Sequence, residues 1–95
     1  MAYRKFTLCE KNNIRPIMFL ISVTEKYMAN FDKRLLEEFY VLVKQVCQNH
    51  LSTVFFDGWK LKDFTYADFY DHEHLNIHGA AKFGTYLNDF IEVLE

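Results

Sequence analysis

The chain has 95 residues, of which 51% are apolar and 18% aromatic, so it holds enough hydrophobic material to fold and lacks the composition of a disordered segment. Domains commonly run to about 100–150 residues, so this length predicts one domain, or part of one, and excludes a second. The net charge is -2 at pH 7 and the basic residues are scattered, which provides no basic patch for nucleic acid or an anionic membrane.

The first segment with a clear pattern, residues 3–13, has helical apolar spacing and ends in Lys11-Asn12-Asn13, which is typical of a helix end. Residues 14–21 form a near-continuous apolar run with Pro16 near its start. Such a run predicts a parallel strand that is buried on both faces. Residues 22–30 form a polar connection to which the sequence assigns no structure.

From Lys33 to Asn49 apolar residues recur at intervals of three and four, which predicts an amphipathic helix with Asn30 or Asp32 as its N-cap. Residues 53–56 are β-branched and aromatic and precede a turn signal at Asp57-Gly58, so they predict a second short strand. Strand, helix and strand in this order form a βαβ unit with parallel strands.

Residues 57–76 show no clear period, although their five aromatic residues indicate that they pack on the body of the protein. A loop of about twenty residues in a small domain is usually functional or wrongly assigned. Helical spacing returns from Ile77 to Leu94, and Asn76 is placed as the N-cap. The sequence thus predicts two parallel strands and about three helices. This arrangement resembles part of a larger domain, because parallel sheets normally have more than two strands.

The two cysteines, Cys9 and Cys47, are too few for a disulfide framework, and their apolar helical surroundings favour free, buried thiols. The longest apolar stretch, residues 14–23, contains Arg15 and Pro16 and falls short of the ~20 residues of a membrane span. The amino-terminal residues do not lead into the apolar segment of a signal peptide. We therefore expect a soluble chain without an export signal.

The richest stretch in ionisable side chains is a turn that runs into the last helix. Asp71, His72, His74 and His78 fall within eight positions, and of the four histidines only His50 lies elsewhere. In an open α/β sheet, ligands bind beyond the carboxyl ends of the strands, and the second strand leads into this loop. An Asp that orients a His is the acid-base half of a hydrolytic triad, so Asp71 and His74 are candidate catalytic residues.

Two other interpretations of the same turn stay open. An Asp at a helix start commonly serves only the helix dipole or a cap. His74 and His78 are four residues apart and share a helix face, and with Asp71 or His72 they offer nitrogen and oxygen ligands for Zn²⁺. No further ligand follows His78 and no cysteine is close, so we assign neither a metal nor a cofactor.

The turn resembles a known sequence block. The closing block of the SGNH (GDSL-like) hydrolases is similar to the run Phe69-Tyr70-Asp71-x-x-His74-Leu75-Asn76-x-x-Gly79-Ala80-x-x-Phe83. The similarity is greatest to the cell-envelope branch, akin to the D-alanyl transfer proteins of teichoic acid and to exopolysaccharide acyltransferases. Upstream, Asn13-Ile14-Arg15-Pro16-Ile17-Met18-Phe19, the long helix and the strand that ends in Phe56-Asp57 also fit.

The resemblance implies a partial, flavodoxin-like three-layer α/β sandwich, the carboxyl-terminal portion of an SGNH domain. It implies that Asp71 and His74 complete a triad with a Ser near the amino end of the full domain, and it implies a place at the extracytoplasmic face of a bacterial envelope. The nucleophile block and the Gly and Asn blocks of the oxyanion hole have no counterpart here. Ser22 is the best substitute nucleophile in the chain, followed by Thr24.

Two functions follow as expectations. The first is the acid-base half of an esterase or O-acyltransferase for acyl groups of envelope glycans or teichoic acid, inactive without its missing half or a partner chain. The second is a non-catalytic remnant or interaction module that self-associates through its exposed sheet edge. We expect a homo-oligomer in either case, and an acylated glycan as the substrate in the first.

Overall fold

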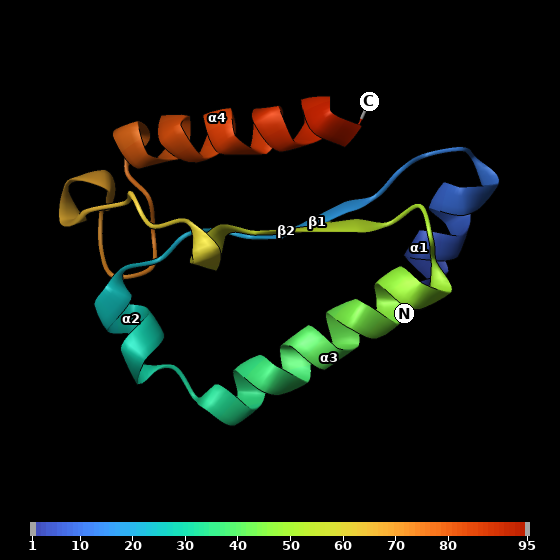
Figure 1. Ribbon diagram of the computed structural model, residues 1–95, viewed down its shortest axis with the longest axis horizontal. Helices are drawn as coiled ribbons and strands as arrows, with labels where there is room; N and C mark the ends of the chain where they lie inside the picture. Colours follow the sequence, from blue (N-terminus) through green and yellow to red (C-terminus); the bar gives the residue numbers. More distant parts are fainter. Residues whose placement is uncertain (1, 95) are drawn as a thin grey trace. The chain divides into compact units, whose positions relative to one another are not determined.

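The computed structural model describes residues 2–94, and its helices and strands are labelled in Figure 1. In chain order they are α1 (Ala2–Lys11), β1 (Ile17–Leu20), α2 (Glu25–Asn30), α3 (Lys33–Asn49), β2 (Val54–Asp57), the short 3₁₀ helices η1 (Gly58–Lys60) and η2 (Tyr66–Asp68), and α4 (Ile77–Leu94). The strands β1 and β2 pair in a parallel, two-stranded sheet. The order β1, α3, β2 is that of a βαβ unit, and it confirms the predicted partial α/β arrangement.

The helix α3 has the predicted bounds, Lys33–Asn49. It begins where Asp32 caps it, because the Asp32 carboxylate accepts hydrogen bonds from the backbone N–H of Arg34 at 2.8 Å and of Leu35 at 3.4 Å. Of the two candidate caps in the sequence, Asp32 is therefore the one used. The helix buries Val43 and Val46.

One prediction about the amino-terminal half was wrong. The strand β1 is shorter than the predicted residues 14–21, and it is not buried on both faces, since Phe19 is exposed and the other three residues are half-buried. The connection after it, to which the sequence assigned no structure, is partly helical. It contains the helix α2, which Thr24 caps by accepting a hydrogen bond from the Tyr27 backbone N–H at 3.2 Å. The described residues thus form four α-helices where about three were predicted.

The chain groups into two compact units whose boundaries pass through both strands. The first unit holds the residues up to 18 together with 32–55. Within it, the rings of Phe39 and Tyr40 on α3 pack against Phe55 of β2, at centroid distances of 6.1 and 6.2 Å. The buried His50 contacts Glu10 through its Nδ1 and stacks on Phe6.

The second unit holds residues 19–31 and the residues from 56 onward. Its core is built around Phe83 of α4, whose ring lies 5.8 Å from Phe19 and 5.8 Å from Phe56. Gly58 allows the chain to pass close to β1, since a Cβ at this position would lie 2.2 Å from the carbonyl oxygen of Leu20. The first residue after β2 therefore has to be glycine to lie this close to β1.

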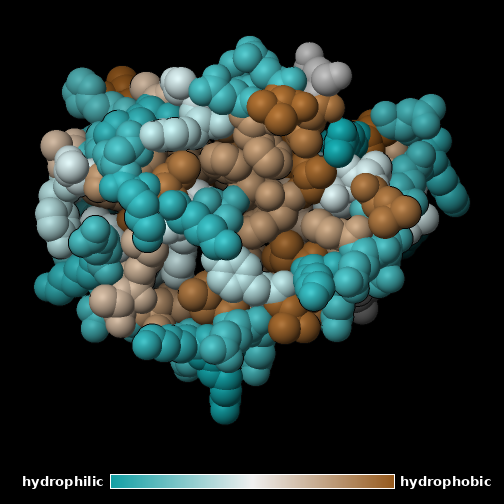
Figure 2. Space-filling view, viewed as in Figure 1, coloured by the Kyte–Doolittle hydropathy of each residue, from teal (hydrophilic) through white to brown (hydrophobic). Residues whose placement is uncertain are grey.

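Hydrophobic side chains also reach the surface, where brown patches alternate with teal in Figure 2 (Figure 2). The exposed large ones include Leu8, Ile14, Phe19, Ile21, Leu35, Val41, Leu42, Leu51, Ile77 and Val93. Both cysteines are free, and they are half-buried where full burial was predicted. None of the helices within residues 2–94 has the length and apolar character needed to cross a membrane.

Candidate Asp–His site

Asn76 connects the charged turn to α4. Its Oδ1 accepts a hydrogen bond from the Gly79 backbone N–H at 2.9 Å, which confirms Asn76 as the N-cap of a helix with the predicted bounds. Its Nδ2 donates to the carbonyl of Ala67 at 2.7 Å, and its backbone N–H donates to the carbonyl of Asp68 at 3.0 Å. One residue thus satisfies backbone groups on both sides of the turn.

An anchor of Thr65, Asp68, Gly79 and Lys82 holds the loop against α4, and Asp68 and Gly79 within it are buried. The Asp68 side chain is only 9% exposed, and its Oδ2 accepts hydrogen bonds from Lys82 Nζ at 2.8 Å and from the Thr65 N–H at 2.9 Å. The Lys82 ammonium, with the Thr65 N–H, lowers the pKa of Asp68 below its ordinary value. A Cβ at Gly79 would lie 2.0 Å from the Asp68 carbonyl oxygen, so this close approach requires glycine.

The turn itself is a narrow hairpin closed by backbone contacts. Phe69 and Leu75 form an antiparallel bridge, and the Tyr70 N–H donates to the carbonyl of His74 at 2.8 Å. The chain therefore reverses between Tyr70 and His74, and this reversal brings the side chains of Asp71 and His74 together.

Asp71 and His74 form the predicted pair. The Nδ1 atom of His74 lies 2.8 Å from Oδ1 and 3.0 Å from Oδ2 of Asp71. Oδ1 also accepts the backbone N–H of Glu73 at 3.0 Å and of His74 at 2.8 Å, so the carboxylate is fixed in place. The Glu73 N–H, followed by the His74 ring, lowers the pKa of Asp71.

This geometry determines which imidazole nitrogen is available for proton transfer. A carboxylate beside Nδ1 holds the proton on that atom, so in the neutral ring the lone pair lies on Nε2. The His74 and Asp71 side chains are 66% and 46% exposed, so the ring is open to solvent. The pair is therefore arranged to accept a proton through Nε2 and to stabilise the imidazolium that results.

The start of α2 supports the turn from a distant part of the chain. The backbone N–H and the hydroxyl of Thr24 both donate to the His72 carbonyl, each at 3.1 Å. Three residues after Thr24, the Tyr27 hydroxyl hydrogen-bonds to the Glu73 carboxylate. Burial and this neighbouring carboxylate raise the pKa of the Tyr27 hydroxyl. These contacts fix the middle of the turn, while the Asn76 cap fixes its end.

The other candidates in the sequence have different roles. His72 contributes its carbonyl, and His78, on α4, helps after Lys82 and Thr65 to lower the pKa of Asp68. Among residues 2–94, no three His, Cys, Asp or Glu side chains are grouped so as to hold a metal ion. The Ser22 hydroxyl is buried and donates to the Gly58 carbonyl at 2.7 Å. The hydroxyls of both candidate nucleophiles, Ser22 and Thr24, thus donate hydrogen bonds to backbone carbonyl groups.

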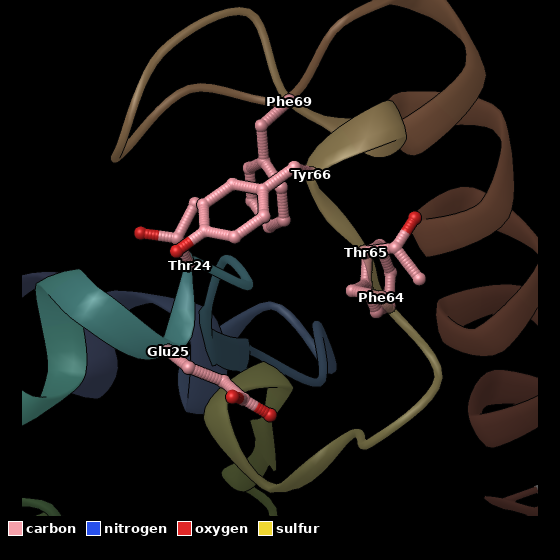
Figure 3. A pocket seen from close by; sticks show the side chains of 6 residues that line it. All are labelled: Thr24, Glu25, Phe64, Thr65, Tyr66 and Phe69. Carbon is pink, nitrogen blue, oxygen red and sulfur yellow. The ribbon is translucent and has the colours of Figure 1, made fainter.

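A hollow of about 220 Å³ lies in the second unit, which also holds the Asp71–His74 pair, and Figure 3 shows its lining. Its lining consists of Thr24, Glu25, Phe64, Thr65, Tyr66 and Phe69. Thr24 also holds the His72 carbonyl, and Phe69 forms the bridge at the base of the turn, so the hollow borders the turn that carries the pair. The sequence signalled only that these aromatic residues pack on the body, because their spacing follows no period.

We compared the chain with models of protein families, with curated proteins and with solved structures, and none of them matches it. The assignment of a function therefore depends on the geometry of the Asp71–His74 pair and on the sequence block that contains it.

Proposed function

We propose that Asp71 and His74 are the acid-base pair of an SGNH-type esterase or O-acyltransferase that acts on acyl groups of envelope glycans or teichoic acid. The observation that carries the proposal is the contact of His74 Nδ1 with both oxygens of Asp71, at 2.8 and 3.0 Å, in a carboxylate already fixed by backbone N–H groups. The resemblance of residues 69–83 to the closing block of that family supports it.

The proposed reaction needs a hydroxyl nucleophile from another segment or a partner chain. His74 Nε2 takes the proton of that hydroxyl while its oxygen attacks the ester carbonyl, and the resulting imidazolium gives the proton to the departing alcohol. The Asp71 carboxylate stabilises the imidazolium between these two steps. A water or a second alcohol then releases the acyl group in the same way, which gives hydrolysis or transfer.

Because the hydroxyls of Ser22 and Thr24 hold backbone carbonyls, we expect this chain alone to hydrolyse a chromogenic acetyl ester no faster than background. The assay is run with and without a fluorophosphonate, which reacts with activated serine hydroxyls. A rate that depends on His74 and is abolished by the fluorophosphonate would show that the chain supplies its own nucleophile.

The proposal itself is tested on the protein purified by an affinity tag from its natural source, together with whatever remains bound to it. We expect a fluorophosphonate to label an activated serine in this material. The substitution His74→Ala should abolish the labelling, because the imidazole that takes the serine proton is lost.

The matched control is His72→Ala, which removes a second exposed imidazole of the same turn and keeps the backbone carbonyl that Thr24 holds. This variant should be labelled like the wild type. Labelling that is absent from the wild type, or equally strong in the His74→Ala variant, would refute the acid-base role.

A second function, a self-associating interaction module, is favoured by the sheet. Within residues 2–94 the sheet has two strands, and Phe19 of β1 and the nearby Ile21 are exposed. Open strand edges beside exposed apolar side chains promote pairing with another chain, so we propose a dimer or larger oligomer. Sedimentation that shows a stable monomer at micromolar concentration would contradict this second proposal.

A further inference from the structure

We infer that the hollow lined by Thr24, Glu25, Phe64, Thr65, Tyr66 and Phe69 binds a quaternary ammonium group. This inference does not depend on the proposed function, because it uses neither Asp71 nor His74. It follows from two properties of the hollow, namely its aromatic lining and its charge.

Three of the six lining residues are aromatic. The face of an aromatic ring carries partial negative charge and attracts cations, above all cations without hydrogen-bond donors that lose little on leaving water. The same cluster already attracts an ammonium of the chain itself, since Lys82 Nζ lies 5.1 Å from the centroid of the Phe64 ring. The rings of Tyr66 and Phe69 line the rest of the hollow.

The charge of the lining favours a cation. Glu25 is the one lining residue that carries a formal charge, and within residues 2–94 it forms no ion pair. The nearby charge of Lys82 is compensated, because its Nζ lies 2.8 Å from the Asp68 carboxylate. In Figure 3 the Glu25 side chain extends from the start of α2, below the Tyr66 ring in this view (Figure 3). An anionic ligand would therefore meet an uncompensated negative charge.

The Thr24 hydroxyl is not available to bind the hydroxyl groups of a ligand. It donates to the His72 carbonyl and accepts the Tyr27 N–H, so it is already used within the chain. With a volume of about 220 Å³, the hollow exceeds the ~30 Å³ share of one water molecule several times over and can admit a trimethylammonium group. The charge, the volume and the aromatic lining of the hollow thus agree on one class of ligand.

The test compares choline with 3,3-dimethylbutanol, its neutral analogue of the same shape. Backbone amide signals of the whole chain are followed by NMR while each compound is added at millimolar concentration. We expect choline to shift the signals of residues 64–66 and to bind at least about threefold more tightly than the alcohol, which is the range of a weakly to moderately desolvated cation–π contact.

Substitutions of one exposed ring separate the π contact from simple apolar contact. Tyr66→Leu should weaken choline binding by about 2- to 10-fold, whereas Tyr66→Phe, which keeps the ring, should bind as the wild type does. Glu25→Gln should also weaken choline binding relative to the wild type, because the negative charge of the hollow is lost. The affinity of this variant should depend less on salt than that of the wild type. Tyr70→Leu is the matched control, since Tyr70 is an exposed ring close in sequence that does not line the hollow.

Equal affinities for choline and 3,3-dimethylbutanol would overturn the inference and leave a merely apolar hollow. The same conclusion would follow if choline shifted no signals of the lining residues, or if Tyr66→Leu bound choline like the wild type. Circular dichroism spectra of the variants show whether each is folded. If Tyr66→Leu is not folded, the comparison of choline with 3,3-dimethylbutanol on the wild type still tests the inference.

Discussion

Asp68 and Asp71 lie three residues apart in one loop, and the surrounding groups lower the pKa of both carboxyls. The two carboxylates nevertheless have different partners and different exposure. The Asp68 side chain is 9% exposed and bonds to Lys82, so its charge is used to hold the loop on α4. Asp71 is 46% exposed and bonds to His74, so its charge is directed to a ring that is open to solvent. Both members of the Asp68–Lys82 pair are less exposed than those of the Asp71–His74 pair, with side chains at 9% and 32% against 46% and 66%, and this burial separates a structural pair from a candidate chemical one.

The largest effect expected from altering the anchor of Thr65, Asp68, Gly79 and Lys82 comes from Gly79→Ala. The added Cβ would meet the Asp68 carbonyl at 2.0 Å, so the loop must move away from α4. We expect a loss of about 2–3 kcal/mol in the free energy of unfolding, typical of overpacking, measured by urea denaturation.

Gly84→Ala in the same helix is the control, because nothing lies within 4 Å of its added Cβ. It should raise stability by up to about 1 kcal/mol through helix propensity. If the two substitutions had similar effects, Gly79 would not be the contact that fixes the loop.

Asp68→Asn should destabilise the protein less than Gly79→Ala and change its response to acid. Because the folded pKa of Asp68 is lowered, its stabilisation is fully present above the ordinary carboxyl pKa near 3.8. It is lost as the pH falls from there through the lower folded value. Thermal unfolding between pH 7 and pH 2 should therefore show a shallower acid loss for the variant. Parallel curves for the two proteins would contradict this role of Asp68.

Thr24→Val tests the support that reaches the turn from α2. The variant keeps the size of the side chain but loses the hydroxyl that bonds to the His72 carbonyl and caps α2. We expect a loss of about 1–2 kcal/mol and faster amide hydrogen exchange in residues 72–74. Thr24→Ser keeps the hydroxyl and should behave like the wild type. Exchange that is unchanged in Thr24→Val would show that the turn does not depend on this contact.

The smallest effect on stability is expected from Asp71→Asn. The pair is exposed, and an amide oxygen at this position can still accept the backbone N–H groups of Glu73 and His74. The thermal midpoint at pH 7 should match that of the wild type within error. A marked fall in the midpoint would make Asp71 a structural residue like Asp68 and remove the contrast between them.

The sequence predicted well the segments in which one strong local pattern decides the structure. Apolar periodicity and a capping side chain predicted that α3 begins after Asp32 and that α4 begins after Asn76. The six residues of α2 are too few to show a period, and only the cap at Thr24 signalled this helix. Full burial of β1 was predicted from its apolar run, but a two-stranded sheet leaves Phe19 exposed.

The candidate site was predictable in part, for a similar reason. The spacing of Asp71 and His74 suggested a pair because three residues of turn bring such side chains into contact. The anchor could not be predicted, because Asp68 and Lys82 are fourteen positions apart and only the fold brings them together. The role of Thr24 was equally hidden, since its bond to the His72 carbonyl spans forty-eight positions.

The most direct test of the Asp71–His74 pair is the rate of fluorophosphonate labelling, per folded molecule, in protein purified from its natural source. Asp71→Asn should reduce the rate by up to about 10⁴-fold with its thermal midpoint unchanged, because the imidazolium loses its carboxylate. Asp68→Asn should lower the midpoint and leave the rate of the folded molecules as in the wild type. Labelling of Asp71→Asn at the wild-type rate would contradict the acid-base role of the pair.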